Sequence, residues 1–197
     1  MMIIIVNMNE ICAIIDVQGF NLEEKFVVRE FAICSDVLTQ TQELNPNKHW
    51  KNYSPKDQEI IKHCTKFVHG LYYCPFNDME YAFLPHSDNI GSIIKTYYEM
   101  IVTPEKAKLG FKNQFLRKIL AEQNIPSIDL DNPIYEIPSI KIIEQIFGNN
   151  YHCGIHNKRP LRDPDSGKII PFRCAYRKVS NLWRFLKNKQ LEEMSQS

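Results

Sequence analysis

The length and composition of the chain are those of a folded protein with one or at most two domains. Its 197 residues are 44% hydrophobic and 24% charged, and only seven are glycine, which argues against extensive disorder. No stretch approaches the ~20 apolar residues of a membrane span, so we expect no membrane partner. The six cysteines are too few and too dispersed for a disulfide scaffold, which indicates a reducing compartment, cytoplasmic or nuclear.

The first part of the chain predicts three consecutive strands. Residues 11–17 are an apolar run suited to a buried strand, and Gly19 and Asn21 mark a turn after it. Residues 25–34 are rich in β-branched and aromatic side chains, and a third strand is predicted around residues 37–44. Three strands with short connections predict an antiparallel meander.

Helical periodicity begins after the third strand. Ser54 and Pro55 suit the N-cap and the first position of a helix. The predicted helices are residues 54–70, 89–100, 114–122, 138–147 and 174–187, and the later strands are residues 106–111 and 127–130. This order predicts a single α/β domain over residues 1–189, with three layers and a mixed sheet of about five strands. Residues 190–197 are predicted to be a flexible tail.

Residues 151–189 carry a ligand pattern for zinc. Cys153 and His156 form a C-x-x-H step, and Cys174 follows after a loop rich in turn residues. Thiolate and imidazole ligands that meet in a tetrahedral arrangement bind zinc, with a fourth ligand supplied from elsewhere in the chain. The alternative is a buried Cys153, a surface His156 and a Cys174 at a helix start that never meet.

The same segment is strongly basic. Residues 151–189 hold ten Lys and Arg residues against two Asp residues, a net charge of +8, which leaves −7 on the remainder of a chain with a formal charge of +1. Such a module suits a phosphate-bearing partner, although a solvated helix face has the same composition. The cations of the last helix are predicted to point outward. The candidate nucleic-acid contacts are Lys158, Arg159, Arg162, Arg177, Lys178, Arg184 and Lys187.

The segments IIDVQGF and VREFAI resemble the first two strands of the DEDD-type 3′–5′ exonucleases, which have the RNase H-like fold. In that family four carboxylates hold two divalent metal ions that activate water. The resemblance gives Asp16 the first position, whereas the second is Gln18, a neutral amide. No Asp comes directly after the strand at 106–111, although Asp129 and Asp131 farther on are possible substitutes, and Arg177 and Lys178 stand where the fourth carboxylate is expected. Asp16 and Gln18 are therefore interpreted as remnants of a hydrolytic centre that has decayed.

The Cys/His pattern is similar to that of the Maelstrom domain, a catalytically eroded branch of the same superfamily. That domain carries a structural zinc held by Glu, Cys, His and Cys, and Ala follows the last Cys there as it does here. The resemblance implies a zinc site formed by Glu30, Cys153, His156 and Cys174. A glutamate among Phe and Val side chains also needs a partner or a metal ion if it is buried. The alternatives are that Glu30 faces solvent or pairs with His69.

Three functions stay open at this point. The first is a catalytically inactive nuclease-fold protein that binds single-stranded RNA, or acts as a scaffold for protein partners, in piRNA-like silencing or its suppression. The second is a ribonuclease with residual exonuclease or metal-independent activity, in which Asp16, Glu30 or His69 acts as acid or base. The third is a pure protein-interaction module, which would show no RNA affinity and no steep dependence of affinity on salt.

Overall fold

A five-stranded mixed sheet forms the centre of the molecule, with the strand order β3-β2-β1-β4-β5. The computed structural model describes residues 8–46, 48–68, 71, 84–148, 153 and 174–196. The strands are β1 (Ile11–Asn21), β2 (Phe26–Cys34), β3 (Thr39–Glu43), β4 (Lys108–Phe111) and β5 (Ser127–Asp129). Strands β1, β2 and β3 pair antiparallel, β4 pairs parallel with β1, and β5 pairs parallel with β4. This topology confirms the predicted RNase H-like α/β class.

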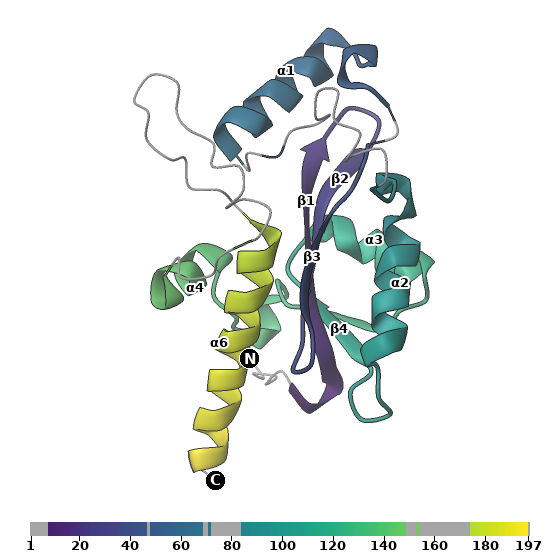
Figure 1. The fold of residues 1–197 in the computed structure, drawn as a ribbon. Helices are drawn as coiled ribbons and strands as arrows, with labels where there is room; N and C mark the ends of the chain where they lie inside the picture. Colours follow the sequence, from purple (N-terminus) through teal and green to yellow (C-terminus); the bar gives the residue numbers. More distant parts are fainter. Residues whose placement is uncertain are drawn as a thin grey trace.

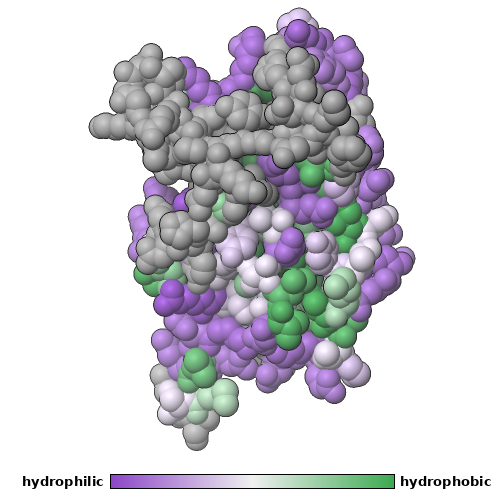
Figure 2. Space-filling view, in the orientation of Figure 1, coloured by the Kyte–Doolittle hydropathy of each residue, from purple (hydrophilic) through white to green (hydrophobic). Residues whose placement is uncertain are grey.

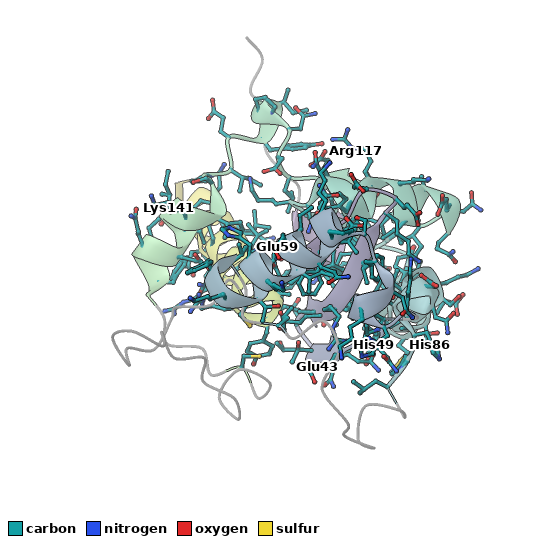
Figure 3. The ribbon with its side chains drawn as sticks, turned by 90° about the horizontal axis from the view of Figure 1, so that it is seen from above. Glu43, His49, Glu59, His86, Arg117 and Lys141 are labelled. Carbon is teal, nitrogen blue, oxygen red and sulfur yellow. The ribbon has the colours of Figure 1, made fainter. Side chains whose placement is uncertain are left out.

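Helices cover both faces of the sheet (Figure 1). The helices are α1 (Pro55–His63), α2 (Ile90–Ile101), α3 (Gln114–Glu122), α4 (Ile140–Phe147) and α6 (Ala175–Gln196). Helices α2 and α3 pack on one face, and α4 and α6 pack on the other. In the view from above (Figure 3), Arg117 of α3 and Lys141 of α4 lie on opposite sides of the sheet. Helix α1 lies over one end of the sheet.

Shorter helical turns connect these elements. A π-helical turn at Cys64–Val68 continues α1. Single 3₁₀ turns lie at Met8–Glu10, Trp50–Asn52, Ser87–Asn89 and Pro133–Tyr135. The Ser54 hydroxyl caps α1 by accepting a hydrogen bond from the Asp57 N–H at 3.1 Å, which confirms the predicted start of this helix.

Strand β1 is longer than the sequence predicted, because Gly19 lies inside it. The register between β1 and β2 shifts directly after Gln18 at a β-bulge. A Cβ atom at Gly19 would lie 2.0 Å from the carbonyl oxygen of Val27, so a residue without a side chain is needed for this close approach. The prediction of a turn at Gly19 and Asn21 was therefore wrong, and the chain turns at residues 22–25 instead.

Three apolar clusters form the core of the described residues: the two larger ones lie on opposite faces of the sheet, and a smaller one packs α1 against β1 and β2. Successive side chains of a strand point to opposite faces, so Ile15 and Val17 of β1 pack with α2 and α3, whereas Ile14 packs with α4 and α6. The same alternation turns Asp16 and Gln18 toward the face that α6 covers. The fully buried side chains of α6 in this second cluster are those predicted to face inward: Ala175, Val179, Leu182, Trp183 and Leu186. Tyr176 and Phe185, which were not predicted to do so, also pack against it.

Helix α6 is also longer than predicted. It continues to Gln196 instead of ending at Lys187 ahead of a flexible tail. Residues 188–196 contain neither Gly nor Pro and include the good helix formers Gln, Leu, Glu and Met. The last turns of α6 extend past the end of the sheet (Figure 1), where Leu191 and Met194 are exposed.

The surface of the described ranges is mostly hydrophilic in the view of Figure 2, with apolar residues gathered beside α2. Large exposed apolar side chains come from several elements, among them Val37, Phe67, Met100 and Ile146. Within these ranges, no helix combines the length and the apolar character needed to cross a membrane.

Candidate metal centre

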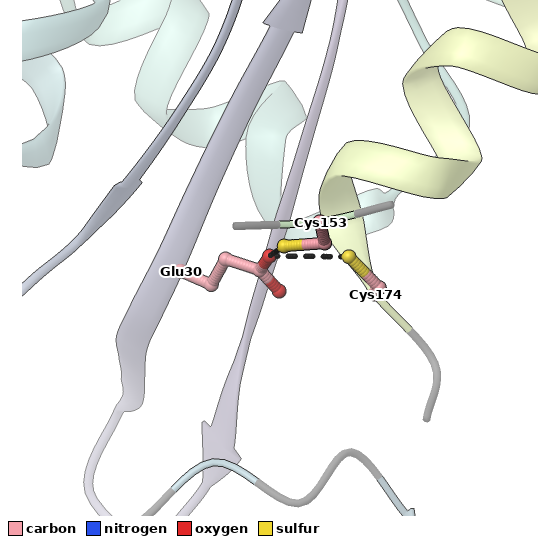
Figure 4. Close-up of side chains that lie close together, drawn as sticks. All are labelled: Glu30, Cys153 and Cys174. Atoms are coloured by element: carbon pink, nitrogen blue, oxygen red, sulfur yellow. Dashed lines mark hydrogen bonds between the residues drawn. The ribbon is translucent and has the colours of Figure 1, made fainter. Parts of the chain in front are cut away.

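Two cysteines and a glutamate converge where α6 begins beside β2 (Figure 4). Oε1 of Glu30 lies 3.4 Å from Cys174 Sγ and 3.9 Å from Cys153 Sγ, and one ligand atom from each residue lies within 4.8 Å of the others. All three side chains are buried, and Glu30 is 0% exposed. The structure thus brings together three of the four side chains that the sequence singled out as metal ligands, in a group that can hold a metal ion.

Local structure explains why Glu30 points at the cysteines. Alternation along β2 places Glu30 on the same face as Ala32 and Cys34, the face covered by α6. Oε2 of Glu30 accepts a hydrogen bond from the backbone N–H of Ala175 at 3.0 Å, and Oε1 accepts one from the Thr41 hydroxyl at 3.3 Å. Because Ala175 is the first residue of α6, the carboxylate also meets the positive end of the helix dipole. The alternative of a solvent-facing Glu30 was therefore wrong.

The separations of these atoms fit a tetrahedral zinc ion. With Zn–S bonds of about 2.3 Å and Zn–O bonds of about 2.0 Å, sulfur and oxygen ligands of a tetrahedral site lie about 3.5 Å apart. The distances of 3.4 and 3.9 Å from the Glu30 oxygen to the two sulfurs are close to this value. Sulfur ligands select zinc over magnesium or calcium, which prefer sites built from oxygen alone.

The protonation state of the cysteines links metal binding to proton release. The hydrogen bond with Cys153, burial and the nearby Glu30 carboxylate all raise the pKa of Cys174. In the metal-free state this thiol therefore keeps its proton. A metal ion displaces the protons of its thiol ligands. Its positive charge would also offset the negative charge of the buried Glu30 carboxylate.

Asp16, interpreted from the sequence as a remnant of a hydrolytic centre, is surrounded by hydrogen-bond donors. Its Oδ1 accepts from Asn113 Nδ2 at 3.0 Å, its Oδ2 accepts from Gln18 Nε2 at 3.2 Å, and Lys178 Nζ lies 3.1 Å from Oδ2. Within the described ranges, Asp16 belongs to no group of three metal-binding side chains. An ammonium and two amides therefore stand around Asp16 where a two-metal site needs further carboxylates.

Comparisons with known proteins assign no family to this chain. No protein-family model matches the sequence, and neither does any curated protein. One similar solved structure is the exonuclease domain of Mopeia virus, soaked with alendronate, at 18% sequence identity and a TM-score of 0.43. The match covers 89% of this chain and 77% of that chain. A likeness at this level transfers neither an activity nor a site.

Sequence reasoning missed Asn113 as a neighbour of Asp16. Asn113 also donates to the Val17 carbonyl at 2.9 Å and caps α3 by accepting from the N–H of Phe115 at 3.1 Å. It follows β4 by two residues, in the region where the resemblance leads one to search for an aspartate. The sequence did carry a signal for this contact: Asn113 stands in the region where the resemblance predicts an aspartate, so its side chain could have been expected near Asp16.

Two cations at the start of α6 are partly buried, in contrast to their predicted outward orientation. The side chains of Arg177 and Lys178 are only 15% and 18% exposed. Nε of Arg177 lies 3.5 Å from Glu144 Oε1 of α4, and Lys178 points to Asp16 of β1. The prediction failed because the first turn of α6 lies between α4 and the sheet. Arg177 therefore pairs with Glu144 of α4, and Lys178 pairs with Asp16 of β1.

The cations farther along α6 keep more contact with solvent. Arg184 is exposed, and its guanidinium lies over the Phe147 ring at 4.8 Å from the centroid. Nζ of Lys187 lies 2.9 Å from Asp36 Oδ1. The remaining candidates fall outside the described residues: the ligand His156, the alternative Glu30 partner His69, and the cations Lys158, Arg159 and Arg162.

Proposed function

We propose that this protein is a non-hydrolytic RNase H-like protein that is stabilised by a structural zinc ion and binds single-stranded RNA. The observation that carries the proposal is the ion pair between Asp16 and Lys178. The resemblance to the DEDD-type exonucleases makes Asp16 the first ligand of a two-metal centre, and such a centre needs several carboxylates. The ammonium repels a divalent cation, and the hydrogen bonds that Asp16 accepts within the described residues come from the neutral amides of Gln18 and Asn113. In the part of the chain that the structure describes, Asp16 therefore has too little negative charge around it to hold magnesium or manganese ions.

The proposed zinc ion ties α6 to the sheet. Glu30 belongs to β2, and Cys174 directly precedes α6, so a shared ion joins elements that are far apart in the sequence. The ligands meet only in the folded chain, and the free energy of metal binding therefore contributes to folding. In this proposal His156 supplies the fourth ligand, in keeping with the resemblance to the Maelstrom domain.

Charge supports the proposed RNA partner. Residues 151–189 carry a net charge of +8, and Arg184 and Lys187 retain exposed surface on α6. Clustered cations of this kind bind the backbone of a single nucleic-acid strand. The resemblance to the Maelstrom domain would place this binding in small-RNA silencing or its suppression, with protein partners of that pathway, in the cytoplasm or nucleus.

The geometry is less favourable to a metal-independent ribonuclease. A general acid or base must reach the proton that it transfers, whereas Glu30 is fully buried against two sulfurs. Asp16 is held by Lys178 and two amides. Both carboxylates are therefore engaged in contacts that stabilise the fold.

The test measures binding and hydrolysis of a labelled single-stranded RNA with one preparation of zinc-loaded protein. We expect binding that weakens steeply as salt rises, and intact RNA after incubation with magnesium or manganese. Arg184→Gln should lower the affinity, whereas Lys118→Gln, an exposed position on the opposite face of the sheet, is the matched control. Cleavage that requires magnesium or manganese would contradict the proposal. If the RNA does not bind in a salt-dependent way, the RNA-binding function is wrong, and a protein-interaction module is the function that remains.

A further inference from the structure

Thr41 connects the edge strand β3 to the buried carboxylate of Glu30. Antiparallel pairing places Thr41 opposite Ala32 of β2, two residues along the strand from Glu30 and on the same face of the sheet. Its hydroxyl oxygen lies 3.3 Å from Glu30 Oε1 and 3.2 Å from the carbonyl oxygen of Phe31. A hydroxyl has one hydrogen to donate, and the charged carboxylate is the stronger of these two acceptors. Thr41 therefore donates to Glu30.

The two oxygens of the Glu30 carboxylate meet different groups. Oε1 lies 3.4 Å from Cys174 Sγ and 3.9 Å from Cys153 Sγ, the contacts that Figure 4 marks with dashed lines. Oε2 accepts the hydrogen bond from the Ala175 N–H at 3.0 Å. Each carboxylate oxygen has two lone pairs. Oε1 can therefore accept from Thr41 with one lone pair and face the two sulfurs with the other, while Oε2 is held at the start of α6.

The orientation of this carboxylate depends on its hydrogen bonds. The last torsion of a glutamate side chain is soft and has no sharp rotamer preference, so packing of the side-chain stem does not fix the plane of the carboxylate. Glu30 is 0% exposed, and solvent therefore supplies no donor to it. The Ala175 N–H and the Thr41 hydroxyl approach from α6 and from β3. Two donors from different elements together fix the plane.

We propose that Thr41 is a positioning residue of the metal centre, whose hydroxyl holds Glu30 so that Oε1 is the oxygen presented beside the two sulfurs. The inference rests on the zinc ion of the proposed function and adds a residue outside the set of ligands. Hydrogen-bond partners that orient metal ligands typically change the metal affinity by about 10- to 100-fold when they are removed. The metal centre then includes the edge strand β3 as well as β2 and the start of α6.

The test measures the zinc affinity of the full chain by competition with a chromophoric chelator. Thr41→Val removes the hydroxyl and keeps a β-branched side chain, which suits a strand. We expect its zinc affinity to be lower than that of the parent by about tenfold or more. Thr41→Ser keeps the hydroxyl and should retain most of the affinity of the parent.

Thr39→Val is the matched control. Thr39 lies on the same strand and the same face as Thr41, but its hydroxyl oxygen lies 3.3 Å from Cys34 Sγ. This variant should bind zinc as tightly as the parent. Thermal melting, at one buffered zinc concentration and in EDTA, separates positioning from a purely structural role. A structural role would lower both melting temperatures of Thr41→Val equally, whereas loss of positioning narrows the difference between them.

The outcomes separate this inference from the proposed function. Equal zinc affinities of the parent and Thr41→Val would overturn the role of Thr41 and leave the zinc ion in place. Equal losses in Thr41→Val and Thr39→Val would also overturn it, because the loss would then belong to the edge strand in general. A parent that binds no zinc overturns both. If Thr41→Val is unfolded, Thr41→Ala is compared with Thr41→Ser, and equal zinc affinities of these two variants would overturn the inference.

Discussion

Cys174 and Lys178 lie one helical turn apart at the start of α6, and the Lys178 N–H donates to the Cys174 carbonyl at 3.1 Å. The Cys174 sulfur lies 3.4 Å from Glu30 on β2, and the Lys178 ammonium lies 3.1 Å from Asp16 on β1. One turn of helix therefore contacts two carboxylates on the same face of the sheet. A metal ion that fixes this turn also fixes the position of Lys178 beside Asp16.

Removal of the metal should destabilise the protein. At free zinc concentrations 100 to 1,000 times the dissociation constant, a bound ion contributes roughly 3–4 kcal/mol to the free energy of unfolding. In a domain of this size, that loss lowers the melting temperature by roughly 10 °C. Calorimetry with and without EDTA measures the shift. Cys174→Ser should melt lower and respond little to EDTA, and an equal response of both proteins would contradict the zinc assignment.

Breaking the pair between Asp16 and Lys178 should destabilise the fold strongly. The side chains are 10% and 18% exposed, and removal of one partner from a buried pair costs about 3 kcal/mol. We expect this loss in Lys178→Met, measured by urea unfolding. The double variant Asp16→Asn/Lys178→Met removes both charges and should recover most of the loss. If the loss of stability in the double variant equals the sum of the losses in Asp16→Asn and in Lys178→Met, the two charges are not coupled.

Gly19→Ala should disrupt the contact between β1 and β2. The new Cβ atom would lie 2.0 Å from the Val27 carbonyl oxygen, which is a backbone atom, so we expect a loss of about 3 kcal/mol in the free energy of unfolding. Gly91→Ala in α2 is the matched control. There the Cβ atom meets the flexible end of Gln123, and the gain in helix propensity is at most about 1 kcal/mol. A Gly19→Ala variant as stable as the parent would refute the close approach.

Asp36 should contribute to stability only above acidic pH. Burial raises the pKa of Asp36, but hydrogen bonds and charge from Lys106 and Lys187 outweigh burial and hold the pKa below its ordinary value. A lowered folded-state pKa stabilises the protein above the unfolded value, about 3.9, and this stabilisation is lost as the pH falls through the folded value. Because the carboxylate is partly exposed, Asp36→Asn should cost about 1 kcal/mol or less at pH 7.

Urea unfolding of the parent and Asp36→Asn at pH 7 and at acidic pH checks this prediction. The difference between the two proteins should shrink toward acidic pH and also shrink in high salt, which screens surface charges. A difference that grows as the pH falls would contradict the assignment of both lysines to Asp36.

Most of the fold could be predicted from the sequence because its elements follow local rules. Apolar periodicity predicted the helix Gln114–Glu122 to the residue, and the Ser54-Pro55 cap set the start of α1. The extension of β1 through Gly19 could not be predicted in this way. On local preference alone, a glycine predicts a turn. Gly19 is needed inside β1 because β2 approaches it closely, and a local sequence pattern does not show that contact.

The candidate site was predictable in part. The spacing of Cys153 and Cys174 predicted two ligands, and the resemblance to the Maelstrom domain implied Glu30 as a third. The structure brings these three side chains together. The pair between Lys178 and Asp16 was not predictable, because it depends on how the first turn of α6 crosses β1. A helix pattern shows which side chains face away from the apolar stripe, but not which neighbouring element will cover them.

The metal content of the purified chain tests the central claim most directly. Elemental analysis should find about one zinc ion per chain in the parent and much less in Cys174→Ser and Glu30→Gln, as expected for a site with several protein ligands. Cys12→Ser is the matched control, because this buried cysteine packs in the cluster on the opposite face of the sheet, and it should keep the zinc of the parent. A parent without zinc, or equal zinc in the parent and Cys174→Ser, would contradict the account.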